Sequence, residues 1–317
     1  MQRNALISVA AGLLSAVLYL STKWSILGAV IFALFSPLPL FAAGLGLGLA
    51  AGVAAALTAT IAVALVANFM GVAVFAIAYV APPLMVVRFA LRHRTAEDGT
   101  TEWYPPGRLL AWIALFGIVG FTAVAVFTGI ITGTGGLRAG ISDYVDTMRG
   151  MIAEPGRSSA SIERVFTTVK LIFPFIITTW WMMIMVGNGV LAQRLLERRG
   201  WNKRPRPDLW TTALPPWPAD VLVAATAAAL LGSGWFGFLG INIALILCVP
   251  YFLVGLAVLH MVSAAWSSRK AILFAAYVLL LLFSWTVVVV AGIGYLEHWT
   301  GLRERFGGPN RSHERKE

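Results

Sequence analysis

The long apolar runs of this chain contain several polar side chains that could do chemistry. None of these side chains carries a permanent charge. They are amides, hydroxyls and one imidazole: Thr178, Thr179, Asn188, Ser233, Asn242, His260 and Ser284. No Asp, Glu, Lys or Arg lies deep in any of these runs. Ion-coupled transporters depend on buried ionisable groups, so their absence argues against that class. Amides and hydroxyls can instead hydrogen-bond a small molecule or a neighbouring helix.

Motifs for enzymatic chemistry are missing. The sequence has no GxSxG nucleophile elbow, no HExxH and no GxxxxGK[ST] phosphate loop. Ser284 and His260 could form an intramembrane protease pair, but no other residue supports it. Asp143 and Asp146 have the spacing of a metal-diphosphate pair, although the solvated face of an amphipathic helix is the simpler interpretation. The single Cys248 excludes a disulfide framework and a Cys-based zinc site. We therefore predict no enzyme activity, catalytic residue, metal or cofactor.

Six residues are candidates for binding a small molecule. They combine aromatic rings, amides and a glycine face: Trp180, Trp181, Asn188, Asn242, Gly44 and Gly48. Gly44, Gly48 and Gly52 recur at steps of four and share one helix face. A pocket near the outer leaflet would be lined by the tryptophans, Asn188 and this glycine face. The alternative is structural, because buried asparagines also bond helices together at about 1 kcal/mol each. His260 is interpreted as a packing residue.

The composition indicates that these residues are held by membrane-spanning helices. Of 317 residues 59% are hydrophobic and 12% are charged, and the mean hydropathy is +0.81. The run 171–191 has no charge and is long enough to cross a bilayer at about 1.5 Å per residue. A basic cluster follows it, from Arg194 to Arg206. Because loops rich in Lys and Arg stay in the cytoplasm, this end is predicted to be cytoplasmic.

The net charge of +10 does not indicate a nucleic-acid partner. The basic residues lie at the ends of apolar runs rather than along one face. Membrane topology and anionic lipid head groups explain them better. We therefore predict a multi-pass protein of the bacterial cytoplasmic (inner) membrane whose main partner is the lipid bilayer.

The hydrophobic runs predict an all-α fold: a polytopic transmembrane helical bundle of eight or nine spans. These are 5–20, 24–35, 40–66, 72–91, 109–131, 171–191, 221–238, 241–262 and 271–295. The second is short and is predicted to be broken or re-entrant, because Pro37 and Pro39 follow it. The third is one long bent span or two short ones. Nine spans would leave the basic tail outside, so one segment, most simply 221–238, is expected not to cross.

The domain prediction is one transmembrane helical domain, 1–300, and a disordered basic tail, 301–317. Within the domain, 132–169 is predicted to be an extracytoplasmic helical excursion. Apolar residues from Leu137 to Ile152 recur at three and four, as in an amphipathic helix. A second helix is expected to begin at Ser158 or Ser159.

Several stretches together resemble a known family. They are the Pro174, Asn188 and Arg194 span, the basic loop into Leu214-Pro-Pro-Trp217, and the Asn242 to Gly255-Leu256-Ala257 hairpin. This layout resembles the YybS-like family of predicted bacterial membrane proteins, a domain of unknown function. That family is distantly similar to the substrate-binding subunits of energy-coupling-factor vitamin transporters. This chain differs from those subunits in its larger number of spans and its long outer excursion.

The resemblance implies that small residues of the first helix dock on a membrane partner subunit; the matching residues here are Gly12, Ser15 and Ala16. It favours a small-molecule-binding membrane subunit of an import system powered by a separate ATPase. The alternative is a non-transport scaffold of envelope or division machinery, and an intramembrane enzyme ranks last.

Overall fold

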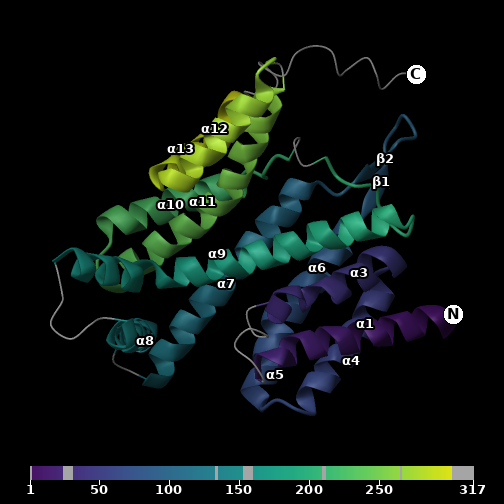
Figure 1. Ribbon diagram of the computed structural model, residues 1–317, viewed down its shortest axis with the longest axis horizontal. Coiled ribbons are helices and arrows are strands. Elements are labelled where there is room, and N and C mark those ends of the chain that lie inside the picture. The colour runs from purple at the N-terminus through teal and green to yellow at the C-terminus, as the bar shows by residue number, and fades with distance from the viewer. Residues whose placement is uncertain are drawn as a thin grey trace. The chain divides into compact units, whose positions relative to one another are not determined.

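The computed structural model describes residues 2–23, 31–132, 135–152, 160–208, 212–264 and 266–301, and this part of the chain is almost entirely helical (Figure 1). The helices are α1 (Gln2–Leu20), α3 (Pro37–Leu47), α4 (Leu49–Ala64), α5 (Phe69–Phe75), α6 (Ala81–Ala90), α7 (Pro106–Thr132), α8 (Gly136–Ile152), α9 (Ala160–Arg198), α10 (Trp217–Leu231), α11 (Gly234–Ser263), α12 (Arg269–Leu282) and α13 (Trp285–Thr300). Short 3₁₀ turns occupy Ser21–Lys23 and Ala33–Phe35, and a π-helical turn, Ala76–Val80, joins α5 to α6. The predicted all-α class is confirmed.

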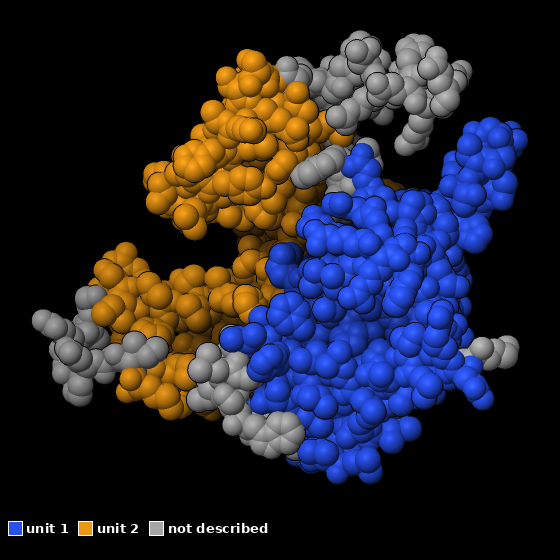
Figure 2. All heavy atoms as spheres, turned by 45° about the vertical axis from the view of Figure 1, so that its right-hand side comes forward, with its two compact units in different colours: residues 1–113, 182–213 blue, residues 114–181, 214–317 orange. Residues whose placement is uncertain are grey.

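The chain forms two compact units, coloured separately in Figure 2. Unit 1 comprises residues 1–113 and 182–213, and unit 2 comprises 114–181 and 214–317. Helices α7 and α9 each contribute residues to both units.

Unit 1 is built on the close packing of α1 and α4. A Cβ atom at Gly12 would overlap the carbonyl oxygen of Ala55 and lie 2.7 Å from the Thr58 Cβ. Ala55 and Ala59 are fully buried there. Small residues let two helix backbones approach closely, which is how helices gain packing energy where lipid supplies no hydrophobic drive.

Prolines and glycines set the helix boundaries of unit 1. The 40–66 run forms two helices, because Gly48 separates α3 from α4 at φ 110°, a backbone angle that favours glycine. Pro37 begins α3 instead of lying in a loop, as suits a residue without an N–H at a helix start. Asn68 caps α5 by accepting a hydrogen bond from the Gly71 N–H at 2.9 Å.

A small β-hairpin, which the sequence did not lead us to predict, follows α6. Strands β1 (His93–Thr95) and β2 (Thr101–Trp103) pair antiparallel, with His93 opposite Trp103. Tyr104 continues the hairpin by donating its backbone N–H to the Arg92 carbonyl oxygen at 3.0 Å. The hairpin keeps the polar loop beside the end of α6.

Unit 2 is organised around α11, which packs against α10 and α13. Gly240 meets α10, where a Cβ would lie 2.5 Å from the Ala229 nitrogen. Gly255 and Gly294 meet across the α11–α13 contact, where a Cβ on either would overlap a backbone carbonyl of the other helix. The amphipathic helix predicted in the excursion is present as α8, with Ile141 and Val145 buried.

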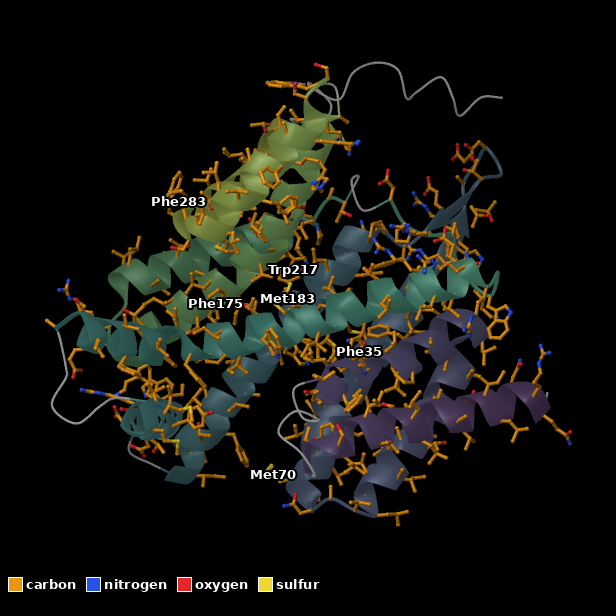
Figure 3. All side chains as sticks on the ribbon, in the orientation of Figure 1. Phe35, Met70, Phe175, Met183, Trp217 and Phe283 are labelled. Atoms are coloured by element: carbon orange, nitrogen blue, oxygen red, sulfur yellow. The ribbon has the colours of Figure 1, made fainter. Side chains whose placement is uncertain are left out.

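Three predicted boundaries in unit 2 are wrong. The second helix of the excursion is not separate, because from Ala160 it continues through Pro174 as the 39-residue α9. The hairpin turn lies at Gly232-Ser233 rather than between Trp235 and Gly240. The last predicted span is two helices, broken at Phe283-Ser284 (Figure 3). Residues 24–30, 153–159 and 302–317, with the predicted caps and tail, lie outside the described residues.

Five of the described helical segments are long and apolar enough to cross a membrane. They are Gln2–Leu20, Phe69–Ala90, Pro106–Ile131, Ala160–Arg198 and Gly234–Ser263. Four shorter apolar segments accompany them: Ala33–Leu47, Leu49–Ala64, Trp217–Leu231 and Trp285–Glu297. The architecture is therefore multi-pass, without confirming eight or nine crossings.

Candidate functional site

Asn188 is the candidate whose hydrogen bonding is incomplete. It lies on α9 in unit 1 and is 4% exposed. Its Nδ2 donates to the carbonyl oxygens of Leu34 and Ile184, each at 2.7 Å. Because both partners are acceptors, the amide nitrogen must face them and Oδ1 must point elsewhere. Oδ1 is buried and has no hydrogen-bond partner. A buried acceptor of this kind is costly unless something donates to it.

Unit 1, which contains Asn188, also contains several interrupted helices. Leu34, its partner across the unit, lies in the 3₁₀ turn before α3. Next to Asn188, a Cβ at Gly189 would lie 3.7 Å from the buried ring of α3 residue Phe41. The α3–α4 break and the π-helical turn belong to the same unit. Interrupted helices are the best indicator of binding sites in membrane transporters, and π-helical turns are frequent at functional sites.

Asn242, by contrast, is saturated. It is fully buried on α11, and its side chain bonds α9 on either side of Pro174. Oδ1 accepts the Phe175 N–H and Nδ2 donates to the Leu171 carbonyl oxygen, both at 3.0 Å. Nδ2 also donates to the Phe238 carbonyl oxygen at 2.9 Å. With these bonds made, Asn242 has a structural role and no free donor for a ligand.

Asn242 contacts α9 at the turn that contains Pro174. In a regular helix the N–H of residue 175 bonds the carbonyl of residue 171. Proline at 174 removes the N–H that would bond the carbonyl of residue 170, and its ring crowds the same turn. Asn242 bonds both of those backbone groups (Phe175 is labelled in Figure 3).

The glycine candidates lie in helix contacts of unit 1. A Cβ at Gly44 would lie 2.8 Å from the methyl groups of Val87 on α6, and Gly52 packs on the Gly44 backbone. Gly48 makes the α3–α4 turn, and its open side faces the Lys203 side chain. This glycine face therefore holds α3, α4 and α6 together.

The tryptophan candidates belong to the other unit. Trp180 and Trp181 lie on the part of α9 that belongs to unit 2, as Asn242 does on α11, whereas Asn188, Gly44 and Gly48 lie in unit 1. The Trp180 side chain is 57% exposed, which suits a lipid-facing ring.

The residues expected to dock a partner are used inside the chain. Gly12, Ser15 and Ala16 are all buried. Ser15 Oγ donates to the Ser36 carbonyl oxygen at 2.7 Å, and Ser36 Oγ donates to the Ser15 carbonyl oxygen at 3.1 Å. Together with the Gly12 contact on α4, this reciprocal pair occupies the face that a partner would need. Sequence spacing identified the face but could not show that α4 and Ser36 cover it.

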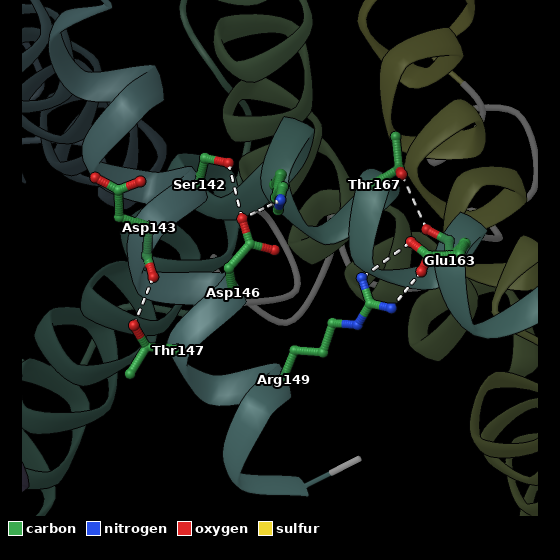
Figure 4. Close-up of polar contacts among 8 residues, drawn as sticks. Ser142, Asp143, Asp146, Thr147, Arg149, Glu163 and Thr167 are labelled. Atoms are coloured by element: carbon green, nitrogen blue, oxygen red, sulfur yellow. Dashed lines mark hydrogen bonds and ion pairs between the residues drawn. The ribbon is translucent and has the colours of Figure 1, made fainter. Parts of the chain in front are cut away.

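Of the two aspartates of α8, Asp146 forms an ion pair with Lys170 of α9. Asp146 accepts hydrogen bonds from Lys170 at 2.7 Å and Ser142 at 3.2 Å, and Arg149 pairs with Glu163 (Figure 4). The Lys170 bond lowers the pKa of Asp146 below its ordinary value. The Asp143 carboxylate points away from Asp146 (Figure 4). Within the described residues, no group of three His, Cys, Asp or Glu side chains could hold a metal ion.

His260 and Ser284 provide no support for a protease pair. His260 Nδ1 lies 3.0 Å from the Leu256 carbonyl oxygen, and its Nε2 lies 3.5 Å from the Tyr277 hydroxyl. Ser284 lies at the start of α13 and makes no side-chain cap. These contacts agree with a packing role for His260.

Arg204, in the basic loop after α9, was not among the residues predicted from the sequence to form a site. Its side chain is only 5% exposed, and Nη1 donates to the Ala90 carbonyl oxygen at the end of α6, at 3.2 Å. Burial lowers the pKa of its guanidinium. Nothing local in the sequence distinguishes Arg204 from the exposed Arg206 two residues later. The contact places the end of α6 and the loop after α9 together.

Comparison with known families places most of the chain in one of them. A family model described as "Predicted membrane protein (DUF2232)" matches residues 13–296, which confirms the resemblance to a family of predicted membrane proteins. No curated protein and no solved structure matches the chain.

Proposed function

Because the chain belongs to the DUF2232 family of predicted membrane proteins, whose members are integral to the bilayer, we propose that it is a membrane subunit that binds a small molecule through unit 1. The observation that supports the proposal is the buried, unpartnered Oδ1 of Asn188, in the same unit as several interrupted helices. The molecule would donate a hydrogen bond to Oδ1 from an N–H or O–H group. With no charged residue at depth in unit 1's helices, a neutral donor fits better than an ion.

The transport role extends this proposal. A binding subunit without a nucleotide motif of its own would need a separate ATPase and a membrane partner for import. Since the Gly12–Ser15–Ala16 face is occupied, that partner would dock elsewhere on the chain. We place the protein in the bacterial cytoplasmic membrane, with α8 outside and the loops after α6 and α9 inside. In that arrangement, eight or nine crossings require that some of the short apolar helices cross the bilayer, singly or as two helices that together make one crossing.

The test is to extract the full-length protein from native membranes and identify retained small molecules by mass spectrometry. Wild type should release a defined molecule. Asn188→Ala should retain up to about tenfold less of it, because losing one buried hydrogen bond costs up to about 1.4 kcal/mol of binding free energy. Asn242→Ala is the matched control, because it also removes a buried amide but one with all its bonds inside the chain. Equal retention by wild type and Asn188→Ala would refute the site. Absence of any ATPase from the native complex would refute the import role alone.

A second candidate is a non-transport scaffold, favoured by a different set of contacts. Asn242, the Ser15–Ser36 pair and the glycines of α1, α11 and α13 are all used to hold helices together. On this hypothesis Asn188 is one more helix tie. A native preparation with no small molecule, in which Asn188→Ala lowers only stability, would favour the scaffold.

A further inference from the structure

Arg204 carries a buried charge that the described residues do not neutralise. Its Nε is buried without a hydrogen-bond partner. Among the described residues, the one hydrogen bond of its side chain is from Nη1 to the Ala90 carbonyl oxygen. In the described part of the chain, the ion pairs are Arg94–Glu102, Arg149–Glu163 and Lys170–Asp146, none of which involves Arg204. Buried charges in proteins are normally paired, because burying an unpaired charge costs several kcal/mol of desolvation free energy.

The position of Arg204 is built by specific contacts. Its backbone carbonyl accepts hydrogen bonds from Gln193 Nε2 at 2.7 Å and from Asn202 Nδ2 at 3.0 Å. Gln193 lies on α9 and is itself buried. The loop is thus fastened to α9 on one side, while the guanidinium reaches the end of α6 on the other.

The surroundings add positive charge. Arg88 and Arg92 lie on either side of Ala90 in the chain and are exposed. Lys203 is exposed as well, with Nζ 3.5 Å from the position of a Cβ at Gly48. Figure 3 shows nitrogen-bearing side chains gathered around the C-terminal end of α9. The carbonyl end of α6 contributes only about half a negative charge, so it does not balance this group of cations.

We propose that Arg204 anchors a site for a phosphate group, which in the membrane is the head group of an anionic lipid. Guanidinium groups bind phosphate through paired N–H donors, and the exposed Arg88, Arg92 and Lys203 would form the rim. The site lies where α6 and α9 end, the depth at which lipid phosphates lie. Nearby, the Trp201 side chain is 54% exposed, as expected for an interfacial anchor beside a lipid. The site is independent of the small-molecule site proposed at Asn188.

The test measures retained lipid on the full-length protein. The protein is reconstituted in nanodiscs of phosphatidylcholine with a minor fraction of phosphatidylglycerol, re-extracted, and its bound lipids are quantified by mass spectrometry. The lipid bound to wild type should be enriched in phosphatidylglycerol relative to the nanodisc. In Arg204→Gln this enrichment should be about tenfold lower, as expected for the loss of one charge-assisted contact. Arg206→Gln is the matched control, because Arg206 is exposed and lies two residues after Arg204. The substitution removes the same charge.

Two further arms separate the outcomes. Arg204→Lys keeps the charge and should retain part of the enrichment, which gives a measurable change even if Arg204→Gln fails to fold. Inorganic phosphate at millimolar concentration tests the source of the phosphate: if it displaces the lipid from wild type, the anion site stands but a soluble phosphate is its ligand. Equal enrichment in wild type, Arg204→Gln and Arg204→Lys would overturn the proposal, as would an equal loss in Arg206→Gln.

Discussion

Asn242 bonds the backbone of α9 on both sides of Pro174. We predict that Asn242→Ala lowers the free energy of unfolding by about 1–2 kcal/mol, because the Leu171 carbonyl and Phe175 N–H lose their partner in an apolar setting. In a Pro174→Ala background the turn regains the N–H of residue 174 and loses the ring that crowds it, so the backbone depends less on the amide. There the cost of Asn242→Ala should fall by about 1 kcal/mol. Reversible unfolding in mixed micelles, followed by circular dichroism, measures all four variants.

Thr226→Ala supplies the control for this cycle. Its hydroxyl bonds only the Leu222 carbonyl of its own helix, at 2.8 Å, so its loss removes no contact between helices. It should change stability little, and equally in both backgrounds. If Asn242→Ala costs the same with proline or alanine at 174, the amide is not serving the interrupted turn.

At the scale of elements, glycine sets the distance between α11 and α13. A Cβ at Gly294 would overlap the Tyr251 carbonyl oxygen, so the two helices can approach this closely only without one. We predict that Gly294→Ala destabilises the protein by about 1–3 kcal/mol, as overpacking does. The same unfolding measurement applies.

Gly292 on the same helix is the matched comparison. A Cβ there would have nothing within 4 Å. Gly292→Ala should be neutral or stabilising by up to about 1 kcal/mol, because alanine is the better helix former. Similar losses for the two variants would mean that α13 does not pack on α11 through Gly294.

At the scale of the whole molecule, the arrangement of the helices predicts which loops lie on the same side of the membrane, and this can be tested. The contact of Arg204 with Ala90 puts the loops after α6 and α9 at one face. Helices α7 and α9 are both long enough to cross, and α8 lies between them in the chain. Cysteines introduced at Asp98 and Lys203 in a Cys248→Ser background should therefore share one side, and a cysteine at Asp143 the other.

An impermeant maleimide applied to intact spheroplasts checks this arrangement. Positive charge after α9 predicts a cytoplasmic location for the Lys203 side, so only the cysteine at 143 is expected to react before permeabilisation. All three positions are exposed, so differences in labelling report topology rather than burial. Labelling of the cysteine at 203 in intact spheroplasts would contradict the predicted orientation.

The sequence by itself determined the properties that depend on local composition. Apolar runs without charge indicated membrane helices, and the family match agrees. The period of 137–152 predicted α8, and the glycine-rich 40–66 run allowed the two helices α3 and α4. Each of these follows from neighbouring residues, because hydropathy, helical period and turn chemistry are short-range.

Tertiary structure decided which polar and small residues are free. Asn188 and Asn242 look equivalent in sequence, yet only Asn188 keeps an unpartnered atom, since the partners of each come from distant segments. Burial of Arg204, and not of Arg206, likewise depends on where α6 ends in space. The break at Phe283-Ser284 has no proline or glycine to signal it, and Thr286 Oγ1 bonds the Leu279 carbonyl across it at 3.1 Å. The sequence determines the chemical type of each side chain. Its hydrogen-bond partners are determined by the packing of helices that are far apart in the chain.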